Sequence, residues 1–216
     1  MIQVSELYFT DPDGLKILED VHLRIDREDM VFLVGPTRTG KSILVRILAT
    51  ILPPQSGQIL VHGRNIARLS RSKILDLRQR IGFLPQDFTP LPRPVLNNVM
   101  FKLRTLGDFR EKAEEKGLIA LEKVGLTDKL TSPAIELTPL EQIQLGLALA
   151  ICNEPLLLLL DEPFDRLDSM DRNKIFATLK EIHTDGATIL TATQGPLPQG
   201  NEACRTLRLV DGKVLD

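Results

Sequence analysis

One loop restricts the fold of this chain more than any other stretch. Residues 35–42 read Gly35-Pro36-Thr37-Arg38-Thr39-Gly40-Lys41-Ser42 and match the phosphate-binding pattern G-x-x-x-x-G-K-[ST]. An apolar run, 30–34, precedes the loop, and apolar side chains recur at helical spacing over 43–51 before Pro53-Pro54. A buried strand, the loop and a helix are therefore expected in this order, which is the context that the pattern requires.

The residue types of this loop suit a nucleoside triphosphate such as ATP. Its phosphates need several inward-pointing N–H donors at a helix N-terminus, and Gly35 and Gly40 allow the backbone to curl in this way. Lys41 would place its ammonium on the outer phosphates, and Ser42 would offer its hydroxyl to Mg²⁺. Arg38 is open to two interpretations, a phosphate contact or a solvent-facing side chain. The alternative for the whole loop is a glycine-containing turn with an incidental lysine.

A second candidate site element follows the apolar run Leu156–Leu160, which predicts a fully buried strand ending in Asp161-Glu162. Ligands bind at the carboxyl ends of strands in an open parallel sheet, so both carboxylates are expected to face the phosphate loop. Asp161 would hold Mg²⁺ through water, and Glu162 would orient or deprotonate an attacking water. The alternative is a polar strand end without a chemical role.

Composition limits the other possibilities. A chain of 216 residues with 43% hydrophobic residues suits one α/β domain with an inserted lobe. The net charge of -2 gives no overall basic bias, so we expect no nucleic-acid partner. Cys152 and Cys204 are isolated, which is typical of inert thiols in a reduced cytoplasm. No secretory signal or membrane-length apolar stretch is present, so any membrane segment is expected in another chain.

The remaining patterns place elements around the loop. Residues 2–9 and 15–25 predict a hairpin, on which Tyr8 would either stack on a purine base or serve as a half-buried strand aromatic. Residues 58–61 and 81–84 predict strands, and 73–79 a short helix. Amphipathic patterns over 95–106 and 111–124 predict helices of an inserted lobe.

Further signals mark the second half of the chain. Thr138-Pro139-Leu140-Glu141 is a capping box that predicts a helix start. Asp168 is expected to cap a later helix, the run 187–193 predicts a strand that ends before Gln194, and 207–215 predicts a closing hairpin.

In its order of motifs, the chain resembles the ATP-binding subunits of ABC transporters over essentially its full length. The resemblance rests on the loop 35–42, the Gln86 loop that opens a helical lobe, the strand that ends Asp161-Glu162-Pro163, and Leu167-Asp168. It implies an α/β P-loop NTPase fold with a mostly parallel core, an N-terminal antiparallel β subdomain and an inserted helical subdomain. One domain, 1–216, is expected, with 1–86 and 155–216 as core and 87–154 as the helical part. Residues 80–88 and 95–99 are most similar to FtsE-type cell-division ATP-binding proteins, and lipoprotein-release and macrolide-export ATPases share much of this pattern.

The resemblance also implies roles for individual residues. Glu162, Gln194 and Gln86 would be catalytic, Mg²⁺ would be held by Ser42, Gln86 and Asp161, and Tyr8, Thr138 and the loop 35–42 would contact ATP. Such a subunit would form a homodimer, or a heterodimer with another ABC ATPase. It would lie in the cytoplasm at the inner face of the cell membrane. A membrane subunit, FtsX-like or a transporter permease, would dock near Gln86, Phe88 and Leu91.

Two departures from the family pattern affect the expected activity. The signature L-S-G-G-Q/E is replaced by Leu137-Thr138-Pro139-Leu140-Glu141, where Pro139 lacks an N–H and Leu140 adds bulk. The family's switch histidine is replaced by Gln194, which cannot carry a proton. Slow ATP hydrolysis is therefore expected, with a non-hydrolysing nucleotide-gated module as the alternative. A small-molecule kinase would fit the loop but not Gln86 or Asp161-Glu162.

Overall fold

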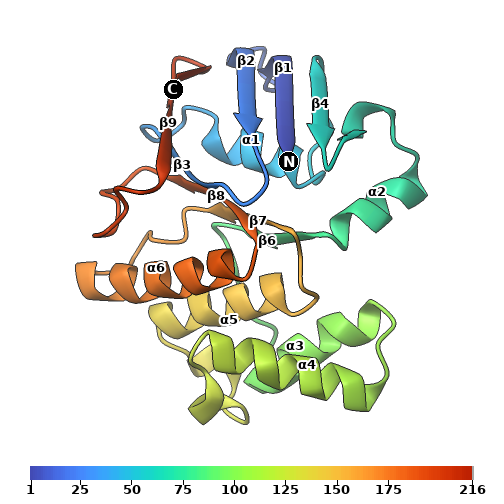
Figure 1. Cartoon of the computed structure of the whole chain (residues 1–216), viewed down its shortest axis with the longest axis vertical. Helices are drawn as coiled ribbons and strands as arrows, with labels where there is room; N and C mark the ends of the chain where they lie inside the picture. The colour runs from blue at the N-terminus through green and yellow to red at the C-terminus, as the bar shows by residue number, and fades with distance from the viewer. Residues whose placement is uncertain (216) are drawn as a thin grey trace.

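The computed structural model describes residues 1–215 and contains two β-sheets and a group of helices (Figure 1). The strands are β1 (Ile2–Thr10), β2 (Lys16–Ile25), β3 (Met30–Val34), β4 (Gln58–Val61), β5 (Arg64–Asn65), β6 (Ile81–Leu84), β7 (Leu157–Asp161), β8 (Thr188–Thr193), β9 (Arg205–Val210) and β10 (Lys213–Leu215). The α-helices are α1 (Lys41–Leu48), α2 (Arg71–Arg78), α3 (Val95–Thr105), α4 (Arg110–Lys123), α5 (Pro139–Ile151) and α6 (Ser169–Thr184), and short 3-10 turns span Ile66–Arg68, Thr127–Lys129 and Ala134–Glu136.

The central sheet has the strand order β10-β9-β3-β8-β7-β6. All neighbouring pairs from β9 to β6 are parallel, and β10 alone is antiparallel to its neighbour β9. The apolar runs of β3 and β7 are buried between layers, as continuous hydrophobic strands of a parallel sheet require. This sheet brings the carboxyl ends of β3, β7 and β8 to one edge, where the phosphate loop begins.

The second sheet is antiparallel and has the order β2-β1-β4-β5. The predicted hairpin forms one side of this sheet, with β2 at the edge and β1 between β2 and β4, so that Ile2 is paired to Ile25 on one side and to Val61 on the other. A backbone hydrogen bond of 2.9 Å from Glu19 N to Gly212 O joins this sheet to the β9–β10 turn. The two sheets enclose α1, whose buried face includes Leu44 and Leu48 (Figure 1).

Helices α3, α4 and α5 follow one another in the chain between β6 and β7. Of these, α3 and α4 lie farthest from the sheets, whereas α5 packs directly against β6 (Figure 1). Their buried side chains, such as Val99, Leu121 and Leu145, continue into one core with the face of the central sheet that α6 covers. The predicted α/β fold with a parallel core, an N-terminal antiparallel sheet and inserted helices is therefore confirmed. The boundaries 87–154 of the inserted part stay a prediction. Across residues 1–215, no helix combines the length and the apolar character that a membrane crossing needs.

Two details of the sequence prediction are wrong. The stripe expected over 43–51 ends early, because α1 stops at Leu48 and Thr50 turns the chain at φ 59°, which leaves Ile51 half exposed. The buried strand expected from Leu156 begins one residue later, since the β7 ladder starts at Leu157. Leu156 lies outside this ladder and its side chain is 50% exposed.

Candidate nucleotide-binding site

The predicted phosphate loop connects β3 to α1, and both of its glycines are required by the structure. A Cβ atom at Gly35 would lie 2.4 Å from the carbonyl oxygen of Leu209 in β9, which leaves no room for a side chain. Gly40 is the N-cap of α1 with φ 99°, a left-handed conformation that favours glycine. Because both positions bring backbone close to neighbouring backbone or side chains, the loop is held against β9 and β2.

Arg38 also has a left-handed backbone, with φ 66°, and its side chain is exposed. For a residue with a Cβ atom this conformation costs roughly 1–2 kcal/mol. Within residues 1–215, its guanidinium makes no hydrogen bond or ion pair. Both interpretations of this side chain, a phosphate contact or a solvent-facing group, therefore stay predictions.

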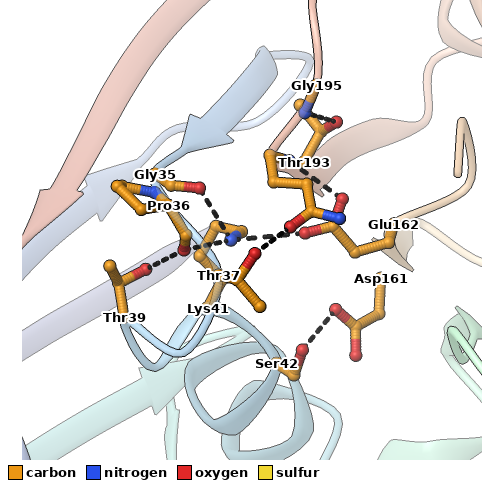
Figure 2. A network of polar contacts seen from close by, with 11 residues as sticks. Gly35, Pro36, Thr37, Thr39, Lys41, Ser42, Asp161, Glu162, Thr193 and Gly195 are labelled. Carbon is orange, nitrogen blue, oxygen red and sulfur yellow. Dashed lines mark hydrogen bonds and ion pairs between the residues drawn. The ribbon is translucent and has the colours of Figure 1, made fainter.

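Lys41 is buried at the start of α1 and turns its ammonium back into the loop. Its Nζ donates to the carbonyl oxygens of Gly35 at 2.8 Å and of Pro36 at 2.9 Å. The same Nζ lies 3.3 Å from Oε1 of Glu162, and both side chains are more than nine-tenths buried (Figure 2). The lysine of the loop and the second carboxylate of the β7 end therefore form one buried ion pair.

Asp161 lies at the end of β7 and is fully buried. Ser42 Oγ donates to its Oδ1 at 2.9 Å, but its Oδ2 has no hydrogen-bond partner among the described residues (Figure 2). Burial raises the pKa of this carboxyl, and the hydrogen bond from Ser42 partly opposes that shift. A buried carboxylate oxygen without a partner, beside a serine hydroxyl, is a donor set that suits Mg²⁺.

Glu162 follows with φ 52° and is tied to the end of β8. Its Oε2 accepts a hydrogen bond of 2.9 Å from the backbone N–H of Gln194. The Gln194 side chain in turn accepts a 2.5 Å hydrogen bond from Thr37 Oγ1. Gln194 thus joins the loop, through its side chain, to the carboxylate, through its backbone N–H. Burial raises the pKa of Glu162, whereas the Gln194 N–H and Lys41 act in the opposite direction.

The segment after Glu162 is anchored in the core by Phe164. This ring is buried and lies 6.3 Å, centroid to centroid, from Phe32 of β3, which in turn lies 5.8 Å from Phe176 of α6. Aromatic contacts of this kind add to the stabilisation that burial gives. The turn behind the carboxylates is therefore packed rather than solvated.

Three predicted site residues lie outside this cluster. Gln86 is exposed in the turn after β6, at the same edge of the sheet as Asp161, but makes no contact with Ser42 or Asp161 among the described hydrogen bonds. Tyr8 lies on the outer side of β1, where its backbone N–H donates to Ser56 Oγ. Partial burial and the neighbouring Asp20 carboxylate raise the pKa of its hydroxyl. Their contacts with ATP or Mg²⁺ stay predictions.

The third residue, Thr138, is the N-cap of α5. The predicted capping box is present: Thr138 Oγ1 accepts from the Glu141 N–H at 3.3 Å, and Glu141 Oε2 accepts from the Thr138 N–H at 2.9 Å. Lys129 Nζ adds an ion pair of 3.1 Å, and the Thr138 N–H and Lys129 hold the pKa of Glu141 below its usual value against some burial. The N-terminus of α5 therefore carries a carboxylate of its own.

The residues of the predicted docking region differ in exposure. Phe88 is partly buried against the helical core, where a Cβ atom at Gly146 would lie 3.2 Å from its ring. Leu91 is 40% exposed, and its backbone N–H donates to the buried Asn98 side chain. Phe88 therefore contributes to internal packing, and Leu91 is the accessible member.

Sequence reasoning missed the contacts that join these residues. The Thr37–Gln194 bridge and the Lys41–Glu162 pair could not be predicted from spacing, because they join positions 157 and 121 residues apart in the chain. The available signal was indirect: Glu162 and Gln194 each follow the end of a strand, and neighbouring parallel strands meet at one edge.

Similar proteins were found in both sequence and structure. A family model described as ABC transporter matches residues 18–165. The cell division ATP-binding protein FtsE of Bacillus subtilis (strain 168) is 30% identical, with 100% of this chain and 95% of that protein covered. The lipoprotein-releasing system ATP-binding protein LolD of Hyphomonas neptunium is 31% identical, with coverage of 100% and 96%. A dimeric structure of the ATP-binding cassette MJ0796, bound to ADP and Pi, has a TM-score of 0.88 and 25% identity, with coverage of 100% and 97%.

The fold and the loop site together define a P-loop nucleotide-binding protein. The family match covers well over half of the chain, and curated relatives match it over its full length. This chain belongs to the ABC transporter family and is an ATP-binding subunit of that type.

Proposed function

We propose that the chain is an ATPase subunit of an FtsE-like complex, in which nucleotide-driven dimerisation acts on a membrane partner. The observation that supports this most strongly is the cluster of Lys41, Ser42, Asp161 and Glu162 around the loop. It combines a cation for the outer phosphates, a hydroxyl and a carboxylate for a metal, and a second carboxylate. The identity is 30% to FtsE and 31% to LolD, so sequence identity does not favour an FtsE-like complex over a lipoprotein-release system. A macrolide-export system, expected to share much of the motif pattern, is a further alternative.

In this proposal Ser42 and Asp161 hold Mg²⁺, because the unpartnered Oδ2 of Asp161 is buried beside the serine hydroxyl. When bound, Mg²⁺ neutralises charge on the phosphate oxygens. Glu162 orients or deprotonates the attacking water, and burial, which raises the pKa of its carboxyl, makes it a stronger proton acceptor. The Gln194 N–H fixes one oxygen of this carboxylate and leaves the other on the Lys41 side.

Hydrolysis is proposed to be slow. The N-terminus of α5, the segment that reaches a partner's phosphate in the family, is capped here by the Glu141 carboxylate, and Pro139 supplies no N–H. A negative charge at this helix end disfavours a second anion. Removal of one positioned donor costs about 10²–10³-fold in rate in well-studied enzymes.

The membrane partner, FtsX-like or a permease, is proposed to dock at the surface around Gln86 and Leu91 from the cytoplasmic side of the membrane. The chain would act as a homodimer or beside a second ABC ATPase. The exposed Leu91 supports this docking, because an apolar side chain next to a turn is available for a short helix of the partner.

The nucleotide site is tested with Lys41→Ala. Calorimetry should show a more than tenfold loss of Mg-ATP affinity, because the ammonium nearest the β and γ phosphates is removed. Lys73→Ala is the control, since Lys73 is exposed on α2 and unpaired within residues 1–215. Unchanged ATP affinity in the Lys41 variant would contradict the site assignment.

The docking surface is tested with Leu91→Asp, which introduces a charge without disturbing the packed Phe88. Co-purification with the membrane subunit encoded beside the gene should be lost, while ATP affinity stays within twofold of wild type. Ile135→Asp, at another exposed apolar residue, is the matched control. Retained co-purification of the Leu91 variant would refute docking here.

A second candidate function is a nucleotide-gated module without meaningful turnover, which the capped α5 terminus and Gln194 favour. The two candidates differ in one measurement. Turnover of the chain together with its membrane partner, compared with Glu162→Gln, separates them: a rate equal to that of the variant supports the module, and a clearly higher rate supports the ATPase.

A further inference from the structure

A cavity of about 490 Å³ lies at the amino end of β7, away from the carboxyl end that carries Asp161. Four parts of the chain surround it: the second half of α4, the end of α5 with the residues that follow, the start of β7, and the end of α6 with the turn before β8. A volume of this size is in the range of small-molecule sites. No residue of the phosphate loop lines it.

The wall of this cavity is largely apolar. Its interior includes Ala120, Ile151, Leu158 and Ile182, all buried or nearly so. Ile119 is 59% exposed, and Leu156, the residue that precedes the β7 ladder, is 50% exposed; both also line the cavity. Two large aliphatic side chains thus remain open to solvent beside a concave apolar surface, which indicates a surface that an apolar group can cover.

The charges that line the cavity are not equivalent. Lys123 of α4 forms an ion pair with Asp185, which follows α6, and Lys116 is paired with Asp108 at 2.8 Å. Glu154 is the fourth charged residue of the lining, and within residues 1–215 its carboxylate has no hydrogen bond or ion pair. The one uncommitted charge of the cavity is therefore negative.

We propose that this cavity binds a small amphiphile with an apolar body and a cationic head. The apolar body covers Ile119 and Leu156, and the head pairs with Glu154. An anionic head fits less well, because it would have to displace Asp108 from Lys116 or Asp185 from Lys123. This site is separate from the nucleotide site and does not depend on the proposed function.

Three ligands that share one apolar body test the proposal: n-octylamine, n-octanoate and n-octanol, titrated by calorimetry into the full chain at pH 7.5 and low salt. The amine should bind at a single site, at least fivefold more tightly than the other two. Glu154→Gln should reduce this preference to less than twofold, and Glu154→Lys should make octanoate the preferred ligand. Glu136→Gln, at an exposed and unpaired glutamate elsewhere, should change nothing.

Other outcomes would overturn the proposal. Equal affinity for the three ligands in the wild-type chain would mean an apolar surface without charge selection. No saturable binding would mean that the cavity is only a packing defect. A preference for the amine that survives Glu154→Gln would place the cation elsewhere.

Discussion

Replacement of Asp161 by Asn should stabilise the chain when no divalent cation is present. Asp161 is fully buried, and its Oδ2 lacks a partner among residues 1–215. A buried polar group without a partner costs about 1–3 kcal/mol, and more when it is charged. Asn keeps an oxygen that can accept from Ser42 and removes the charge. The gain should therefore be about 1–3 kcal/mol at pH 7.5, or roughly 2–12 °C in Tm for a chain of this length.

The pH dependence of this effect has a definite sign. Burial raises the pKa of Asp161 in the folded chain, so the folded state binds the proton more tightly than the unfolded state does. The stabilisation is thus present below the unfolded pKa and is lost as pH rises through the folded pKa. The Asn variant lacks this loss, and its advantage in Tm should grow with pH over that window. Removal of the charge should also lower the pKa of Glu162, because the Asp161 carboxylate contributes to raising it.

Thermal melts from pH 4 to 8, in EDTA and with Mg-ATP, measure both effects. Asp76→Asn, at an exposed and unpaired residue of α2, should change the free energy of unfolding by no more than about 0.5 kcal/mol. With Mg-ATP the ranking should reverse, because the variant lacks the carboxylate for the metal. A Tm of the Asp161 variant at or below wild type in EDTA at pH 7.5 would refute the reasoning.

Two further changes test the loop and the altered motifs. Arg38→Gly should raise the free energy of unfolding by about 0.5–1 kcal/mol, because relief of the left-handed backbone conformation exceeds the entropy cost of glycine. Differential scanning calorimetry measures this change. An unchanged or lower Tm would contradict backbone strain at Arg38. Pro139→Gly with Leu140→Gly and Gln194→His should raise ATPase turnover by more than the product of the separate effects, because the family brings these elements to one phosphate. Circular dichroism must first show that the triple variant is folded, since glycines at the start of α5 cost about 1–2 kcal/mol, and a folded triple variant without turnover favours the module.

The fold could be predicted from the sequence wherever a short sequence pattern is compatible with only one local structure. The loop 35–42 between an apolar run and a helix, the capping box at Thr138 and the cap at Asp168 depend on neighbours in the chain, and all are present. The start of β7 at Leu157 rather than Leu156 could not be predicted, because it depends on where β6 and β8 begin. The apolar run itself does not determine where the neighbouring strands begin.

The candidate site was predictable in its members but not in its connections. Lys41, Ser42 and Asp161 were expected near one another from the order of motifs, and the structure brings them to one edge. The bridge from Thr37 through Gln194 to Glu162 depends on side-chain reach across two strand ends, which no sequence period specifies. The exposure of Gln86 depends in the same way on the tertiary arrangement of a turn.

The contact between Phe32 and Phe164 has a consequence for how variation in this chain is tolerated. Glu162 stands two residues before Phe164, whose ring packs on Phe32 of β3, and Phe32 packs in turn on Phe176 of α6. The position of the Glu162 carboxylate therefore depends on how well these three rings fit together. A close-packed interior transmits a change of even one methylene group. An aliphatic replacement at Phe32 or Phe176 would therefore shift the Glu162 carboxylate, although neither ring is near it in the sequence. The chemistry of the site thus depends on the packing of the hydrophobic core as well as on the polar residues.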